Sequence, residues 1–332
     1  MAALLREFCT ILHVHLIAVF DLIRQLFTPH CYAKGVVNQN GHIAIVTGGA
    51  SGIGFETTKK LCTNGMRVFI ASRSEEEAND AIERIRRDDP EASVEWMYLD
   101  LASLMSVRRC ASTFKSYDLP LHVLVNNAGV MIPPFMKTED GFELQFQVNY
   151  LGHFLLTLLL SDLLIKTGVH NKCARIVNVS SVAHICEDLD MNNLIDRTFY
   201  GKYSSYSNSK FAIILSSYRL HQKLMTRGNH VTVNCVHPGV VNSELFHHYH
   251  WALQPLRRIC AMLHVLKTPE EGSETSVYVA LSTELEGNGG LYFANCVAEK
   301  SSSRTYDKCL QNELWDRSIE LASVTEKELF YD

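Results

Sequence analysis

A tyrosine and a lysine four residues apart, Tyr206 and Lys210, are the residues in this chain best suited to catalysis. Residues i and i+4 share one helix face, and the apolar pattern of Phe211–Leu224 predicts a helix here. A tyrosine hydroxyl is normally a poor base because its pKa is about 10. An ammonium beside it favours the phenolate and brings that pKa toward the working range. Such a pair is also common on protein surfaces, so it indicates catalysis only together with other motifs.

Two further polar residues lie where they can assist that pair. Ser181 follows the β-branched run Ile176–Val179, which predicts a strand, and can donate to the oxygen that Tyr206 would protonate. Asn149 interrupts an apolar helix predicted over 141–165, and a buried asparagine costs free energy unless it is paired. We therefore expect Asn149 to have a water or backbone partner near the site.

A glycine-rich turn follows the first predicted strand, 42–47, and leads into an amphipathic helix that ends near Asn64. Gly48, Gly52 and Gly54 permit a tight turn and let backbone N–H groups approach a pyrophosphate. The spacing is T-G-x-x-x-G-x-G rather than G-x-G-x-x-G. Placed between a strand and a helix, the turn indicates a dinucleotide site.

The second predicted strand, 67–71, ends beside Arg73, where a dinucleotide fold meets the adenosine ribose. An acidic residue here would bind the ribose 2′-hydroxyl, whereas an arginine suits a 2′-phosphate. Arg73 therefore favours NADP(H), with NAD(H) as the alternative because Glu75–Glu77 follow closely. In the competing interpretation Arg73 is a solvated residue at the start of the next helix.

Strands and helices alternate along the rest of the chain. Further strands are predicted at 94–99, 121–125, 176–179, 231–236 and 289–293, and further helices at 76–87, 103–115, 141–165, 204–227, 268–282 and, on the surface, 304–322. The pattern predicts an α/β fold, a single Rossmann-type doubly wound parallel sheet with helices on both faces. Asp100 follows the third strand, where it can accept from an adenine amino group. Asn126 opens an N-N-A-G turn after the fourth strand.

The amino terminus is apolar from Phe8 to Phe20, which is shorter than the roughly 20 residues of a spanning helix. We expect residues 1–33 to form an uncleaved membrane anchor or an interfacial helix. A cleaved signal peptide and a soluble helix packed on the domain are the alternatives. A linker at 34–41, a catalytic domain at 42–322 and a tail at 323–332 complete the expected organisation.

Composition argues against several kinds of partner. The net charge is −5 and no long basic run is present, which argues against nucleic acid. The ten cysteines include no C-x-x-C pair, which argues against a zinc site and favours buried thiols in a reducing compartment. Segment 244–267 contains His247, His248 and His250 without a carboxylate or cysteine at ligand spacing. We expect a lid over a greasy substrate there, and no metal.

In combination, these motifs resemble the short-chain dehydrogenase/reductase family over residues 41–322. The resemblance implies that Ser181 orients the substrate oxygen, Tyr206 is the general acid/base, and Lys210 binds the nicotinamide ribose and tunes Tyr206. It also implies that Asn149 holds a water in a proton relay. The expected cofactor-binding positions are Gly48, Ser51, Gly52, Ile53, Gly54, Arg73, Asp100, Leu101, Asn126, Ala128, Tyr206, Lys210, Pro238, Gly239, Val241 and Ser243.

The phrases NNAGVM, NYLGHFLL and VNVSSVAH resemble the branch of this family that holds the retinol dehydrogenases. The resemblance implies a membrane-associated NAD(P)-dependent oxidoreductase of a lipophilic alcohol and its aldehyde or ketone, either an isoprenoid such as polyprenol and polyprenal or a retinoid. It implies the endoplasmic reticulum or a lipid droplet, with the cytoplasm as alternative, and allows a homodimer. A steroid dehydrogenase and a catalytically idle dinucleotide-binding scaffold are the competing functions.

Overall fold

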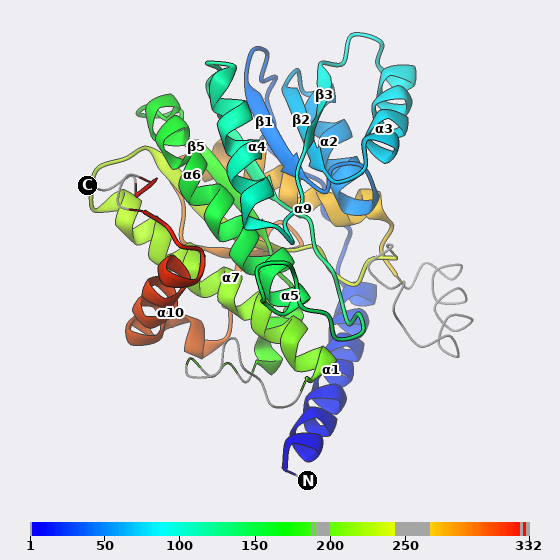
Figure 1. Cartoon of the computed structure of the whole chain (residues 1–332). Helices are drawn as coiled ribbons and strands as arrows, with labels where there is room; N and C mark the ends of the chain where they lie inside the picture. Colours follow the sequence, from blue (N-terminus) through cyan, green and yellow to red (C-terminus); the bar gives the residue numbers. More distant parts are fainter. Residues whose placement is uncertain are drawn as a thin grey trace.

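Buried β-branched segments form a central eight-stranded sheet (Figure 1). Its strands are β1 (Ile43–Thr47), β2 (Arg67–Ser72), β3 (Val94–Tyr98), β4 (Val123–Asn126), β5 (Ala174–Val179), β6 (Val231–His237), β7 (Tyr292–Ala294) and β8 (Val297–Glu299). Their order is β3-β2-β1-β4-β5-β6-β7-β8, and every pair is parallel except β7 with β8. The direction of winding reverses between β1 and β4. In open α/β sheets, ligands bind at the carboxyl ends of the strands beside such a reversal.

Helices cover both faces of this sheet, which confirms the doubly wound α/β prediction. The computed structural model describes residues 2–187, 189, 191, 200–242, 266–325 and 328–329. The helices are α1 (Ala2–Phe27), α2 (Gly52–Thr63), α3 (Glu75–Asp88), α4 (Leu104–Ser116), α5 (Leu144–Phe146), α6 (Gly152–Thr167), α7 (Lys202–Met225), α9 (Pro269–Leu281) and α10 (Lys308–Leu321). One hydrophobic core lies between the sheet and α2, α3 and α9, and the other between the sheet and α4, α6, α7 and α10.

Three elements differ from the sequence prediction. The helix expected over 141–165 begins at Leu144 and contains a π-helical turn, Gln147–Leu151, before α6. The three-residue strand β8 was not predicted, because an edge strand this short is too short to show an alternation of apolar and polar residues. The helix α10 was expected on the surface, but it packs on α7 and fully buries Leu314 and Trp315.

The amino-terminal helix α1 extends beyond the domain at its N-terminal end (Figure 1). Its outer face is an apolar stripe, hereafter the outer stripe, of Leu5, Phe8, Leu12, Leu16, Val19, Phe20, Ile23, Leu26 and Phe27, all exposed. Among the described residues, two helical segments are long and apolar enough to cross a membrane, Glu7–Phe27 and Leu144–Thr167. The second is mostly buried and serves as a core helix, whereas only 6% of the first is buried.

A disulfide joins the segment after α1 to the turn between β7 and β8. It connects Cys31 with Cys296, whose Cα atoms are 6.1 Å apart. The sequence predicted mostly buried thiols, and this pair is an exception that no local spacing in the sequence could indicate. The buried free thiols that were expected do occur, at Cys62, Cys110 and Cys235 among others.

Candidate active site

The expected site residues that the structure describes gather at one edge of the sheet, because parallel strands all end on the same side. The glycine turn follows β1, Arg73 follows β2, Asp100 follows β3, Asn126 ends β4, Ser181 follows β5 and Pro238 follows β6. Tyr206 and Lys210 reach this edge from α7. The expected residue Ser243 and the lid segment up to residue 265 lie outside the described residues.

Tyr206 and Lys210 are buried, and they form one cluster with the half-buried Ser181. The Tyr206 hydroxyl is hydrogen-bonded to the Ser181 side chain. Lys210 Nζ donates to the backbone oxygen of Val179 (2.9 Å) and lies 5.7 Å from the centre of the Tyr206 ring. Tyr206 is 6% exposed and Lys210 4% exposed, so both polar groups are withdrawn from bulk water. The serine hydroxyl and the phenol are thus placed to contact the same substrate oxygen.

Burial acts on the two titratable groups in opposite directions. It raises the pKa of Tyr206 to about 12, against a smaller lowering by the Ser181 hydrogen bond. It lowers the pKa of Lys210 to about 8. Loss of solvent around the phenolate is the larger of the two causes acting on Tyr206. The expectation that Lys210 lowers the pKa of Tyr206 stays a prediction. Tyr206 is held as a proton donor at neutral pH.

Asn149 has the backbone partner that the sequence predicted. Its Oδ1 accepts from Val130 N (2.8 Å), and its Nδ2 donates to Val130 O (3.0 Å) and Ser209 Oγ (3.0 Å). Asn149 lies in the π-helical turn and is fully buried. A π-turn frees a backbone carbonyl from the regular ladder and often marks a functional site. Here the turn connects the N-N-A-G segment with α7.

Sequence reasoning missed His153, one turn after Asn149. Its Nδ1 bonds to Asn149 O (3.0 Å), so Nδ1 carries the proton, and Nε2 accepts from Thr47 Oγ1 (2.8 Å). Burial lowers the pKa of His153 to about 4, which keeps the ring neutral. Thr47 Oγ1 in turn accepts from the backbone N–H groups of Asn127 (2.9 Å) and Ala128 (3.0 Å). This network fixes the ends of β1 and β4 relative to the π-turn. No neighbour in the sequence distinguished His153 from any other histidine in an apolar helix.

The glycine turn has the shape that a dinucleotide pyrophosphate requires. Gly48 and Gly52 have φ of +63° and +53°, which favour glycine. A Cβ on Gly54 would overlap the Gly48 carbonyl oxygen, so only glycine lets α2 start this close to the turn. The exposed Ser51 caps α2 without a side-chain hydrogen bond to the helix. The helix N-terminus is thus open to an anion.

The ends of β2 and β3 supply the groups expected near an adenosine. Arg73 is exposed after β2, and the first turn of α3 beside it carries Glu75–Glu77. Asp100 Oδ1 accepts from Ala102 N (2.9 Å), which shapes the loop itself. Leu101 is buried in the core, so only its backbone can serve a ligand.

The opposite end of the cofactor cleft is formed by the loop after β6. Val241 is buried, and its side chain and that of Ile53 both lie against Gly272 of α9. Gly239 has φ of +90°, so the turn after Pro238 requires glycine. The glycine turn and the Pro238–Val241 loop thus meet at α9.

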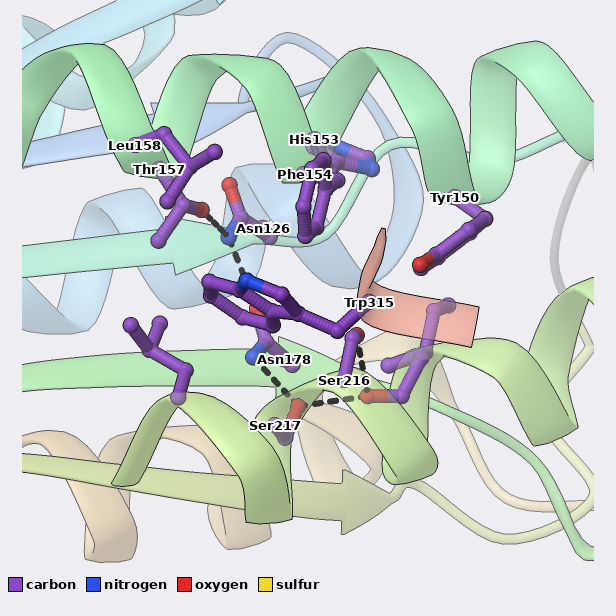
Figure 2. Close-up of a pocket in the computed structure, with 12 residues that line it drawn as sticks. Asn126, Tyr150, His153, Phe154, Thr157, Leu158, Asn178, Ser216, Ser217 and Trp315 are labelled. Carbon is purple, nitrogen blue, oxygen red and sulfur yellow. Dashed lines mark hydrogen bonds between the residues drawn. The ribbon is translucent and has the colours of Figure 1, made fainter. Parts of the chain in front are cut away.

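A small cavity of about 30 Å³ lies behind the site, between the sheet and α6, α7 and α10 (Figure 2). Asn126 Nδ2 donates to Asn178 Oδ1 (2.7 Å) and Thr157 Oγ1 (2.9 Å), and Asn178 Nδ2 donates to Ser217 Oγ (2.8 Å). These polar groups link β4, β5, α6 and α7, with Trp315 closing the cavity. The cavity has room for a water or two. It is too small for a substrate, and Asn126 acts here in sheet architecture.

The comparisons with known proteins agree with this geometry. A family model described as short chain dehydrogenase matches residues 42–252. The chain belongs to the short-chain dehydrogenase family. It is 45% identical over 313 residues to a polyprenol dehydrogenase of Danio rerio, covering 94% of this chain and 96% of the relative. It is 40% identical to human retinol dehydrogenase 14, covering 84% of this chain and 85% of that relative.

Among solved structures, the chain resembles the Pseudomonas aeruginosa RhlG/NADP active-site complex with a TM-score of 0.63 and 26% identity. The alignment covers 78% of this chain and 96% of that structure. As a short-chain dehydrogenase, the protein is an oxidoreductase that uses NAD(P). Its glycine turn, its open α2 N-terminus and its cluster of Ser181, Tyr206 and Lys210 fit such a cofactor and the chemistry of that family.

Proposed function

We propose that the protein interconverts a lipophilic alcohol and its aldehyde, with a long isoprenoid such as polyprenol and polyprenal as the substrate class. The observation that carries the reaction type is the cluster of Ser181, Tyr206 and Lys210 at the carboxyl edge of the sheet. The substrate class is supported by the similarity to polyprenol dehydrogenase and to retinol dehydrogenase 14. The phrases PLHVLVNNAGVM, PGVVN, KTPEEG and STELEGNGG also resemble the dehydrogenase/reductase X-linked protein.

Three side chains have separate roles in the proposed reaction. The bound nicotinamide supplies or accepts hydride. Tyr206, with its raised pKa, holds a proton at its hydroxyl and gives it to the carbonyl oxygen in reduction. Ser181 donates to the same oxygen and stabilises its developing charge. Lys210, when protonated, favours the phenolate that forms on Tyr206.

The cofactor proposed is NADP(H) in preference to NAD(H). Arg73 is exposed at the end of β2, where a guanidinium can pair with a 2′-phosphate. The carboxylates of Glu75–Glu77 in the first turn of α3 compete for the same cation. Arg73→Ser should therefore reduce discrimination for NADPH over NADH and leave turnover with NADH unchanged. If the variant and the wild type discriminate equally between NADPH and NADH, the proposed role of Arg73 is wrong.

The test of the reaction is a substrate screen with full-length protein in detergent. Polyprenal, retinal and a steroid ketone are offered with NADPH and NADH side by side. Tyr206→Phe should lower kcat for the accepted substrate about 10²- to 10⁴-fold, the usual contribution of a general acid. Tyr203→Phe, one turn earlier on α7, is the matched control and should keep activity. Wild-type turnover by Tyr206→Phe with every carbonyl would refute the mechanism.

We also propose that α1 lies in a membrane interface. At about 100° per residue, the outer stripe covers an arc of only about 120° of the helix. Leu12, Leu16 and Phe20 are 54%, 59% and 71% exposed, which water alone does not favour. The opposite face contacts the domain along the helix, from Glu7 to Gln25. This favours a helix lying in the headgroup layer over one that spans the bilayer.

The interfacial helix is tested by flotation with phosphatidylcholine vesicles. Leu12→Ser/Leu16→Ser/Phe20→Ser should weaken vesicle binding at least about 100-fold, because each side chain loses about 1.5–3 kcal/mol of burial. The control replaces three apolar side chains that are exposed elsewhere, Met105, Tyr117 and Val169. Equal binding by both triple variants, or no binding by the wild type, would end the proposal.

A further inference from the structure

The amino-terminal helix binds the catalytic domain through polar residues on the face opposite its outer stripe. Glu7, Asp21 and Gln25 lie about 160–200° around the helix from the centre of that stripe, at 100° per residue. Glu7 Oε1 accepts from Tyr203 N (3.0 Å) near the start of α7. One helix can therefore face lipid and bind the domain at the same time. Its contacts fall on the loops that carry the catalytic residues.

The first of these contacts leads to Ser181. Asp21 Oδ2 lies 2.8 Å from His237 Nε2, and both side chains are largely buried, at 12% and 6% exposure. His237 Nδ1 accepts from Val182 N (3.3 Å), so Nε2 carries the proton and donates it to Asp21. Burial would raise the pKa of Asp21, but the hydrogen bond from His237 and the nearby charges of Arg24 and Lys267 act against it, and the pKa is lowered. The ionised carboxylate thus selects the imidazole tautomer that holds the backbone beside Ser181.

The second contact holds the loop after β6. Gln25 Oε1 accepts from Val240 N (3.1 Å), and Gln25 Nε2 donates to Val240 O (3.4 Å). A Cβ on Gly239 would lie 2.8 Å from Gln25 Oε1, so the approach of α1 requires glycine at this position. The helix therefore pairs with the backbone of the Pro238–Val241 loop much as a neighbouring strand would.

We propose that Asp21 and Gln25 are positioning residues of the active site. The membrane-facing helix α1 thereby contributes to the geometry of that site. Asp21 acts through His237 and Val182 on Ser181. Gln25 acts through Val240 on the loop at the nicotinamide end of the cleft. Seating the helix in lipid then orders the site, in addition to bringing the enzyme to its substrate. Only the expected change in kcat rests on the proposed function.

The experiment compares four variants of the full-length protein in detergent and on phosphatidylcholine vesicles. Asp21→Ala removes the acceptor for His237, whereas Asp21→Asn keeps an oxygen there and is the conservative rescue. Gln25→Ala removes both bonds to Val240. Arg24→Ala is the matched control, because Arg24 pairs with Glu299 on β8 (3.0 Å), which carries no site residue.

Three measurements are made on each variant: kcat and KM for the lipid aldehyde, NADPH affinity by fluorescence, and hydrogen exchange of peptides 180–186 and 236–242. Asp21→Ala should lower kcat about tenfold and accelerate exchange in 180–186, and Asp21→Asn should restore both. Gln25→Ala should weaken NADPH binding at least threefold and accelerate exchange in 236–242. Arg24→Ala should match the wild type in all three while its melting temperature falls.

Two outcomes would overturn the inference. One is equal loss of activity in Asp21→Ala and Arg24→Ala in proportion to their melting temperatures, which would make the helix a general stabiliser. The other is unchanged exchange in both peptides for Asp21→Ala and Gln25→Ala. If Asp21→Ala does not fold, the Gln25→Ala comparison decides alone. Because exchange and NADPH binding need no substrate, they remain decisive even if no lipid carbonyl is turned over.

Discussion

Tyr206 and Lys210 share a buried face of α7, where burial favours the neutral form of each. A phenol with a pKa near 12 stays protonated across the physiological range, which suits the donor in a carbonyl reduction. An amine with a pKa near 8 changes charge close to physiological pH. The rate of carbonyl reduction should therefore depend on the charge of Lys210.

The pH dependence of reduction follows from these directions. Below about pH 8 Lys210 is protonated and favours the phenolate that forms as Tyr206 gives up its proton. Above that pH the charge is lost, so kcat/KM for aldehyde reduction should be flat from about pH 6 to 7 and fall as pH rises through about 8. Stopped-flow measurement of NADPH oxidation across pH 6–10 checks this. Lys210→Met should reduce the aldehyde more slowly and should not show the fall in kcat/KM near pH 8. An unchanged fall in that variant would assign it to another group.

Residue spacing was enough to predict the Tyr206–Lys210 pair and the backbone partner of Asn149. It could not predict that burial raises the pKa of Tyr206, because burial depends on segments distant in the sequence that pack on α7, among them β6. His153 was missed because a histidine in an apolar helix has no distinguishing sequence neighbour. The roles of Ser181, Arg73 and the cofactor-binding positions stay predictions until variants are measured.

The element that shapes the cofactor cleft is the turn from β1 into α2. Its glycines were predicted from the sequence, because positive φ and close approach both select glycine. The π-turn before α6 was not, because the apolar pattern of 141–165 fits an unbroken α-helix equally well. The contacts of Asn149 with Val130 and Ser209 stabilise that turn, and they are tertiary.

Gly54 allows the close packing of the glycine turn against α2 to be tested. Gly54→Ala places a methyl group against the Gly48 carbonyl oxygen and should displace α2 from the turn. We expect NADPH affinity to fall at least about tenfold, measured by fluorescence titration. Gly228→Ala is the control, because Gly228 follows α7, has positive φ and has open space around an added Cβ. It should cost about 1–2 kcal/mol of stability and leave NADPH binding intact. NADPH binding at wild-type strength in Gly54→Ala would contradict this packing.

At the scale of the whole molecule, α1 is joined to the domain at both ends of its polar face and by one covalent bond. Cys31 and Cys296 are 265 residues apart in the sequence, so their pairing depends on the complete fold. Alternating strands and helices predicted the doubly wound sheet, but no local pattern could reveal a contact of this range. A disulfide is typical of an oxidising compartment, whereas the cysteine spacing alone had favoured a reducing one.

The disulfide should stabilise the folded enzyme. Cys31→Ser is expected to lower the free energy of unfolding by about 2–4 kcal/mol, because a long loop in the unfolded chain is no longer closed. Urea unfolding under non-reducing conditions measures this. Cys309→Ser, at an exposed free thiol, is the control and should change stability little. Peptide mapping that finds Cys31 and Cys296 both alkylated without reduction would contradict the bond.

The position of Cys296 also sets an order of events during synthesis. Cys31 leaves the ribosome 265 residues before its partner exists, an interval of about 13–53 s at 5–20 residues per second. Throughout that interval the apolar side of the nascent helix has no finished domain behind it. If α1 binds a membrane interface as we propose, a lipid surface near the ribosome is its first apolar partner, and the β7–β8 hairpin is joined to the helix last.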